Sequence, residues 1–360
     1  MDTISFARGI PAPECLPVAE LADCAKEALE RDGSVALSYG STLGYAPLRE
    51  WLAERHGVEA GRVLVTNGSL QAFHFLLDAL GNDGRVLVER PTYDRLRRIL
   101  AASEIELGEI ATDDDGLHVD ELERALDGGP TAFLYTIPTF QNPTGVTLSE
   151  ERRRRVAGLV HASGSRVLED DPYGLVRFEG EPLPTLFELE GGDNVMYGSS
   201  FSKTIAPGLR VGYAIVPRAL VAGLEELVAS TYITPGLLGQ ATVYQFLRRG
   251  LFESNLERVR ELLGLRRDAM LDALERELSG RARWNRPEGG YFLWLELPET
   301  VDASKLLTQA ADAGVTFVPG ADFGGAPSTA RLAFSFVSPA EIDEGVRRLA
   351  RLLAPAPAPV

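Results

Sequence analysis

The feature that most constrains the fold is a regular alternation of short apolar runs with amphipathic stretches through the middle of the chain. The apolar runs are typical of strands, and the stretches between them have the spacing of helices. The expected strands cover residues 62–66, 85–89, 131–136, 165–169, 195–197 and 211–216, and the expected helices cover 71–80, 93–103 and 150–163. Strands that alternate with helices in this way form mostly parallel sheets covered by helices. The pattern therefore predicts a large α/β unit.

The last third of the chain has a different pattern. The elements expected there are a long charged helix at 251–278, an antiparallel strand at 290–297, helices at 303–313 and 339–353, and strands at 315–318 and 331–336. A Pro-rich entry and an amphipathic helix at 18–31 begin the chain. These patterns predict a large domain over 36–252 and a smaller α+β domain from 1–35 together with 253–360. The alternating Ala-Pro tail at 354–359 is expected to be disordered.

Charge and composition exclude several classes of protein. The formal net charge of −16 argues against nucleic acid and anionic membrane surfaces as partners. A membrane-spanning helix needs about 18 consecutive apolar residues, and no run in this sequence approaches that length. The N-terminus has no signal-peptide pattern, so a cytoplasmic location is expected. Two cysteines and four scattered histidines predict neither a disulfide framework nor a metal site.

Lysine is rare in this chain, and one lysine is placed unusually. The only lysines are Lys26, Lys203 and Lys305, and all other basic residues are arginine. Arginine cannot replace lysine where an amine must lose its proton and attack a carbonyl. Lys26 and Lys305 lie in helical patterns and are expected to be surface charges, whereas Lys203 lies in a Ser-rich loop. Lys203 is therefore the candidate for amine chemistry.

Polar residues follow the expected strands, where an open α/β sheet binds its ligands. Gly68 and Ser69 open a helix, which suits a phosphate but also an ordinary helix cap. Tyr93 can stack on a planar ring or pack beneath its helix. Asn142 lies in a Pro-flanked loop that would hold its amide rigidly, and Asp170 needs either a cationic partner or solvent.

A further cluster of donors and cations comprises Ser200, Ser202, Lys203 and Arg210. In this order the motifs resemble those of fold-type I pyridoxal-phosphate enzymes of the class I/II aminotransferase family, most closely the 2-aminoadipate and aromatic aminotransferase branch. The matching segments are 44–49, 68–69, 91–93, 141–145, 169–173, 200–203, 207–210, 287–290, 318–320 and 330–332. The resemblance implies a PLP-transferase fold, with a large domain and a smaller one. It also implies ping-pong transfer of an amino group from an L-amino acid to a 2-oxo acid, with 2-oxoglutarate expected, through a Lys203 aldimine.

The resemblance also implies roles for individual residues. Lys203 would hold the cofactor and then carry the proton at the substrate Cα. Asp170 would keep the pyridine nitrogen protonated, Asn142 and Tyr173 would bond the phenolic oxygen of the ring, and Tyr93 would stack on its face. The phosphate would be bound by Gly68, Ser69, the main-chain N–H of Leu70, Ser200, Ser202 and Arg210, with Tyr39 reaching in from the neighbouring subunit of a homodimer.

The substrate carboxylate would be clamped by Arg331 beside Gly9 and Asn142. Arg8 stands where close relatives have a small residue, so it is either exposed to solvent or reaches an acidic substrate side chain. The arginine run at 152–155 is expected to form a solvated helix face.

Two alternatives differ from this interpretation. The same fold and cofactor serve lyases, decarboxylases and cyclising synthases that act on amino acids, and the fold does not distinguish these outcomes. Some transcription regulators also use the fold as an effector domain, but they require an N-terminal winged-helix module. The sequence begins directly in the enzyme motif and is strongly acidic, which disfavours that alternative.

Overall fold

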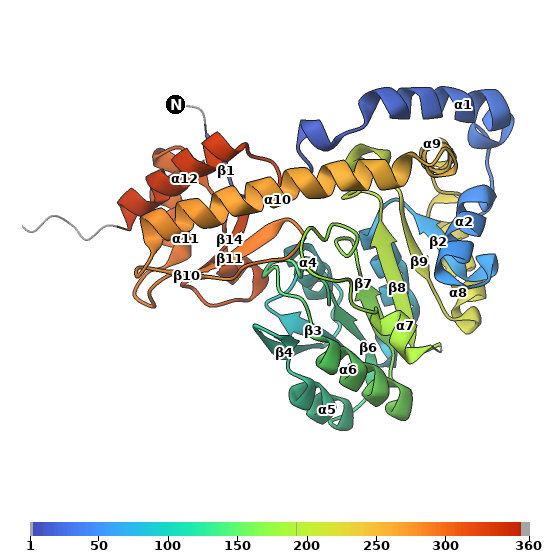
Figure 1. The fold of residues 1–360 in the computed structure, drawn as a ribbon. Coiled ribbons are helices and arrows are strands. Elements are labelled where there is room, and N and C mark those ends of the chain that lie inside the picture. Colours follow the sequence, from blue (N-terminus) through green and yellow to red (C-terminus); the bar gives the residue numbers. More distant parts are fainter. Residues whose placement is uncertain (1–2, 192, 354–360) are drawn as a thin grey trace, which may run out of the picture.

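An eight-stranded sheet forms the centre of the larger part of the molecule in a computed structural model, which describes residues 3–191 and 193–353 (Figure 1). Its strands, in spatial order, are β2 (Val63–Thr66), β9 (Gly212–Ile215), β8 (Val195–Ser200), β7 (Val167–Asp170), β6 (Thr131–Thr136), β3 (Arg85–Arg90), β4 (Leu107–Asp113) and β5 (Gly116–Leu117). The block β8-β7-β6-β3-β4 is parallel, whereas β9 runs antiparallel to β2 and β8, and β5 runs antiparallel to β4. The prediction of a mostly parallel α/β sheet is confirmed.

Both faces of this sheet are buried because successive strand residues point to opposite sides. Val86 and Val88 of β3 face one apolar cluster, and Leu87 between them faces another. Phe73 of α3 packs in the first cluster and Val156 of α6 in the second. The helices of this part are α2 (Ala46–His56), α3 (Ser69–Leu80), α4 (Asp94–Ala102), α5 (Val119–Asp127), α6 (Glu150–Ser163), α7 (Leu186–Glu190), α8 (Arg218–Tyr232) and α9 (Leu237–Arg248).

The remaining elements form a smaller α+β part. A four-stranded antiparallel sheet has the order β10 (Arg283–Trp284), β11 (Phe292–Glu296), β14 (Thr329–Ala333), β13 (Val318–Pro319), and β1 (Ile4–Ser5) pairs in parallel with β12 (Val315–Thr316). Its helices are α11 (Ala303–Asp312), α12 (Pro339–Leu352) and the long α10 (Leu251–Leu278), which runs from α9 to α12 (Figure 1). Short 3-10 turns cover Pro13–Cys15, Ala60–Arg62, Gly81–Asp83, Pro207–Leu209 and Gly320–Phe323.

The N-terminal helix α1 (Val18–Ala36) lies beside α9 rather than on the small sheet (Figure 1). Cys24 and Ala28 of α1 share an apolar cluster with Leu48 of α2 and Phe246 of α9. The chain thus passes from β1 along α9 before it enters α2. The domain boundaries at 36 and 252 stay a prediction, and the Ala-Pro tail lies outside the described residues.

Two predicted strands are wrong in their extent. The segment 315–318 is not one strand, because β12 pairs with β1 and β13 pairs with β14, so the chain changes sheets at Phe317. The strand predicted at 331–336 begins earlier, at Thr329, and ends at Ala333; Phe334 is fully buried, but it lies outside the strand ladder. The sequence pattern did not predict β4, because many of its residues are polar and partly exposed. It also did not predict α8 and α9, because these two helices follow each other without a strand between them.

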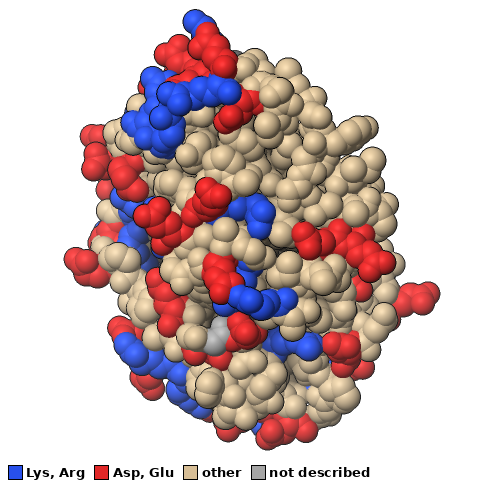
Figure 2. Space-filling model, turned by 90° about the vertical axis from the view of Figure 1, so that its right-hand side faces the viewer, with Lys and Arg blue, Asp and Glu red and all other residues tan. Residues whose placement is uncertain are grey.

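On the face drawn in Figure 2, acidic and basic side chains lie interspersed. Many arginines pair with carboxylates; examples are Arg155 with Asp120 at 2.6 Å and Arg166 with Asp83 at 2.8 Å. Within the described ranges, no helix has the length and apolarity needed to cross a membrane.

Candidate active site

A cavity of about 570 Å³ opens at the carboxyl ends of β7 and β8, beside the loop that follows β2. The predicted site residues that line it are Gly9, Gly68, Ser69, Leu70, Tyr93, Asn142, Asp170, Tyr173, Ser200, Ser202, Lys203, Arg210 and Arg331. These residues span more than 320 positions of the sequence, so the fold itself brings them together. A larger cavity of about 750 Å³, whose lining includes Asp113 and Arg283, contains none of them.

Lys203 is held inside this cavity by polar and aromatic contacts. Its Nζ donates a hydrogen bond to the Gly9 carbonyl at 2.7 Å. The same nitrogen lies 5.2 Å from the ring centroid of Tyr291 and 5.7 Å from that of Tyr173. The Tyr291 hydroxyl donates to the Lys203 carbonyl at 2.9 Å, which fixes the backbone at this point. The amine therefore has a defined position within the cavity.

The surroundings also favour the neutral form of this amine. Burial lowers the pKa of Lys203 to about 8, the cations Arg331 and Arg210 contribute in the same direction, and Asp170 opposes them. A pKa of about 8 leaves about a tenth of the amine unprotonated at pH 7. Lys203 can therefore act as a nucleophile and as a base near neutral pH.

Asp170 presents one unpartnered carboxylate oxygen at the cavity wall. Its Oδ2 accepts a hydrogen bond from the Tyr135 hydroxyl at 2.6 Å, whereas Oδ1 is buried with no hydrogen-bond partner in the described part of the chain. Burial raises the pKa of Asp170 to about 6, although the Tyr135 hydrogen bond opposes the shift. A cationic N–H donor on a ligand would satisfy Oδ1, so the site fits a protonated pyridine nitrogen. Sequence reasoning missed Tyr135, because an aromatic residue inside a strand resembles ordinary core.

The turn at Gly68 is built for close approach of an anion. Gly68 has φ +93°, a conformation that favours glycine, and the N-terminus of α3 follows it. A Cβ on Gly212 of β9 would lie 2.5 Å from the Gly68 carbonyl carbon and 2.5 Å from the Ser69 nitrogen. Only glycine at 212 therefore lets β9 support this turn, a role that sequence reasoning missed because no motif included this residue.

Two serines and an arginine complete this end of the cavity. The Ser200 hydroxyl donates to Ser202 Oγ at 2.8 Å, and the Arg210 Nη2 donates to the Asn67 carbonyl at 2.9 Å. Arg210 has φ +53°, a left-handed conformation that is uncommon for residues other than glycine. Together with the α3 N-terminus, these donors fit a phosphate group.

Arg331 also lines the cavity, and two hydrogen bonds hold its guanidinium. Its Nη1 donates to Asn142 Oδ1 at 2.8 Å and its Nη2 to the Ala7 carbonyl at 2.9 Å. The guanidinium carbon lies 4.3 Å from the Phe292 ring centroid and 4.8 Å from that of Phe323. Its buried Nε has no hydrogen-bond partner within the described ranges. This donor can bind a ligand carboxylate.

The loop that carries Asn142 is tied to the loop before α4. Gln141 Nε2 donates to Glu89 Oε2 at 3.1 Å and to the Pro91 carbonyl at 2.7 Å. Glu89 also accepts hydrogen bonds from the Thr136 hydroxyl at 2.6 Å and the Ile137 N–H at 3.1 Å. Burial raises the pKa of Glu89, and these donors oppose the shift. Glu89 was missed because it follows an apolar run and resembles a charge at a strand end.

Two predicted residues do not line the cavity. The Arg8 guanidinium lies over the Phe336 ring, 5.1 Å from its centroid, and Tyr39 is 78% exposed. Their roles in substrate and phosphate binding stay predictions. The described residues contain no group of three His, Cys, Asp or Glu side chains placed to hold a metal ion.

One prediction about the surface is wrong. Arg153, within the run expected to be a solvated helix face, has a fully buried side chain, whereas the Arg154 side chain is 61% exposed. The helical spacing of buried residues on α6 turns Arg153 towards the sheet, together with Val156 and Val160.

The fold and this site define a pyridoxal-phosphate enzyme of fold type I. The chain belongs to the aminotransferase class I and II family, whose sequence profile matches residues 10–349. It is 40% identical to the 2-aminoadipate transaminase of Thermus thermophilus over 97% of this chain and 90% of that protein. It is 36% identical to the aromatic-amino-acid aminotransferase 1 of Thermococcus litoralis, over 98% of this chain and 88% of the relative.

A solved structure agrees with this assignment. LysN, an alpha-aminoadipate aminotransferase of Thermus thermophilus complexed with N-(5'-phosphopyridoxyl)-L-leucine, superposes with a TM-score of 0.93 at 38% identity. The match covers 98% of this chain and 92% of LysN. The chain is a pyridoxal-phosphate-dependent aminotransferase, and the lyase, decarboxylase and synthase alternatives find no support in these relatives.

We expect Gly212→Ala to weaken binding of pyridoxal phosphate to the apoprotein by about tenfold or more, because the added Cβ displaces the turn at Gly68 and Ser69. Gly223→Ala on α8 is the matched control, because a Cβ there meets no atom within 4 Å. Fluorescence titration of each apoprotein with the cofactor measures both affinities. Equal affinities for the two variants would contradict the role given to Gly212.

Proposed function

We propose that this enzyme transfers the amino group of an L-amino acid to 2-oxoglutarate, with Lys203 and Arg331 as its central residues. One observation carries the proposal: the Lys203 amine, the buried guanidinium of Arg331 and the unpartnered Oδ1 of Asp170 all line the same cavity. Arg331 in this arrangement can bind the carboxylate of an amino acid, while the Lys203 amine can react with a carbonyl group in the same cavity.

Pyridoxal phosphate, when bound, supplies an electron sink for the bond that breaks at the substrate Cα. Asp170 Oδ1 would accept a hydrogen bond from the ring nitrogen and keep it protonated. Asn142 and Tyr173 would donate to the phenolic oxygen, and Tyr93 would pack on the ring face. The α3 N-terminus, Ser69, Ser200, Ser202 and Arg210 would hold the phosphate, with Leu70 contributing its main-chain N–H.

Lys203 would carry the proton. Because its amine is unprotonated in part near pH 7, Nζ would be able to take the proton from the substrate Cα and hold it there for return. The Gly9 carbonyl, 2.7 Å away, accepts from Nζ and keeps it directed into the cavity. The rings of Tyr173 and Tyr291 lie beside the amine, with their centroids 5.7 and 5.2 Å from Nζ.

Arg331 would bind the α-carboxylate of both substrates. Its Nε has no partner among the described residues, and Nη1 is already oriented by Asn142, so binding would recover an unpaired buried donor. Arg95 and Arg98 also line the cavity and are available to the second carboxylate of 2-oxoglutarate. Apolar neighbours such as Ile10 and Val318 suit an aliphatic or aromatic side chain of the donor.

The proposal includes a homodimer in the cytoplasm. Leu37, Tyr39 and Ile233 are large apolar residues that are more than half exposed, which a second copy of the chain would cover. In such a dimer Tyr39 would reach the phosphate in the neighbouring site. The free, buried Cys15 and Cys24 suit a reducing compartment.

A single-turnover reaction tests the proposed function. With an amino donor alone, the holoenzyme should release about one equivalent of 2-oxo acid per active site and then stop, because the amino group stays on the enzyme. Addition of 2-oxoglutarate should restart the reaction and produce glutamate. Continuous product formation from the donor alone would indicate a lyase or decarboxylase instead.

The pH dependence of cofactor capture tests Lys203. We expect the rate at which the apoprotein binds pyridoxal phosphate covalently to rise with pH, with a midpoint of about 8, because only the neutral amine attacks a carbonyl. Borohydride reduction followed by peptide mass analysis measures the capture. Lys203→Ala should capture none, and cofactor found on Lys26 or Lys305 instead would refute the assignment.

We expect Arg331→Lys to raise KM for the amino acid and the oxo acid together by about tenfold or more, because an ammonium loses the bidentate fork. Steady-state kinetics with each substrate varied in turn measure the effect. Arg283→Lys is the control, since its side chain is 85% exposed and outside the site. Unchanged KM values in Arg331→Lys would mean that the carboxylate is bound elsewhere.

A further inference from the structure

A fully buried arginine lies directly behind the active site, and none of the assigned roles uses it. Arg153 of α6 is 0% exposed, although the neighbouring Arg152 and Arg154 extend towards the surface. We propose that Arg153 is a positioning residue for catalysis, because its guanidinium joins the loop that carries Asn142 to the strand end that carries Asp170. The proposal rests on the roles given above to those two residues.

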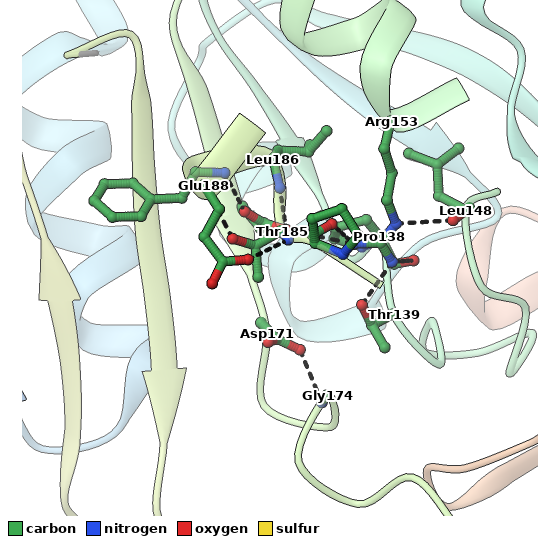
Figure 3. Close-up of polar contacts among 12 residues, drawn as sticks. Pro138, Thr139, Leu148, Arg153, Asp171, Gly174, Thr185, Leu186 and Glu188 are labelled. Carbon is green, nitrogen blue, oxygen red and sulfur yellow. Dashed lines mark hydrogen bonds and ion pairs between the residues drawn. The ribbon is translucent and has the colours of Figure 1, made fainter. Parts of the chain in front are cut away.

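On one side, Arg153 holds both ends of the Asn142 loop. Its Nε donates to the Leu148 carbonyl at 2.8 Å, and its Nη2 donates to the Pro138 carbonyl and to Thr139 Oγ1, both at 2.7 Å (Figure 3). The Leu148 N–H donates to the same Pro138 carbonyl at 2.8 Å. The neck of the loop, meaning its two ends at Pro138–Thr139 and Leu148, is thus bonded to one guanidinium.

On the other side, Arg153 reaches the segment beside Asp170. Its Nη1 donates to the Pro184 carbonyl at 3.1 Å and lies 4.0 Å from Glu169 Oε1. Glu169 accepts from the Leu186 and Phe187 N–H groups at 3.0 and 2.9 Å, at the start of α7. Glu169 immediately precedes Asp170 in β7, so these contacts fix the end of that strand.

The charges in this cluster depend on one another. Arg153 and Glu169 are both 0% exposed, and a buried ion pair is tolerated only when its remaining donors and acceptors are satisfied. Burial and the neighbouring Asp171 raise the pKa of Glu169 to about 7, and the α7 amides and Arg153 oppose the rise. Asp171 itself accepts from the Gly174 N–H at 2.8 Å (Figure 3). It also accepts from the Tyr197 hydroxyl at 2.9 Å. The cluster is almost fully bonded, which favours a single geometry.

The tip of the Asn142 loop has separate supports. Gln141 bonds Glu89 and the Pro91 carbonyl, and Asn285 Nδ2 donates to the Thr144 carbonyl at 2.7 Å. A weaker contact at Arg153 would therefore loosen the neck of the loop and shift Asn142 without releasing the whole loop. Asn142 would then lose its alignment with Arg331 Nη1, now at 2.8 Å, and with the phenolic oxygen of the cofactor.

The test compares Arg153→Lys with Arg154→Lys, the same substitution one residue further along the helix. Lysine keeps the charge but cannot reach four acceptors in different directions. We expect Arg153→Lys to speed amide hydrogen exchange in residues 139–147 of the apoprotein by about tenfold or more and to raise the pH midpoint of the visible cofactor band in the holoenzyme. The fold decrease in kcat of this variant should be larger than the fold increase in its KM. Arg154→Lys should leave all of these unchanged.

A milder variant keeps the test valid if Arg153→Lys does not fold. Thr139→Val removes a single acceptor of the guanidinium and should cause smaller changes in the same direction. Variants that lose only thermal stability, with normal exchange and a normal cofactor band, would overturn the proposal, as would equal effects in Arg154→Lys. The exchange measurement needs no cofactor, and the wild-type single turnover checks the proposed function separately, so the two failures can be distinguished.

Discussion

The burial of the Lys203 amine is the constraint on which the rest of the site depends. In water a lysine is almost wholly protonated at neutral pH, but here burial and two nearby cations bring its pKa down to about 8. The lowered pKa means that the folded protein disfavours the charged form of this amine, so the protonated amine in that position costs free energy. The Gly9 carbonyl and two tyrosine rings hold the amine in place. The other site residues are arranged around this nitrogen, which is neutral in a usable fraction near neutral pH.

The charges of the cavity follow from that position. Arg210 and the α3 N-terminus provide positive charge in one part of the cavity wall, and Arg331 and Asp170 line the same cavity. Two of these groups have an unpaired buried atom among the described residues: Oδ1 of Asp170 and Nε of Arg331. A ligand with two anionic ends and a cationic ring nitrogen would satisfy all of them at once. Binding of such a ligand would therefore gain free energy by satisfying hydrogen-bonding groups that lack a partner without it.

The sequence predicted the sheet well because its signals are local. Alternating residues such as Val86, Leu87 and Val88 pack on opposite faces, and both faces are apolar. Polar residues in the loops just after the strands, such as Asn142, were found for the same reason, since each follows an apolar run. Tyr135, Glu89 and Gly212 were missed because their roles depend on partners far away in the sequence. Arg153 is different: its helical spacing with Val156 and Val160 was visible, but four consecutive arginines suggested a solvated face.

The buried network around Arg153 has a physical reason that apolar packing could not supply. The loops at 137–148 and 171–186 have little regular secondary structure, so many of their carbonyls lack ladder partners. Arginine carries five N–H donors in a rigid planar group. It can therefore bond carbonyl oxygens from several loop segments at the same time. An apolar side chain in its place would leave the Leu148 and Pro184 carbonyls without the hydrogen bonds that Arg153 donates, and the Pro138 carbonyl with only the Leu148 N–H. The alignment of the catalytic groups is therefore set by satisfied polar contacts beneath the site, because loops can be fixed to one geometry only where their backbone is bonded.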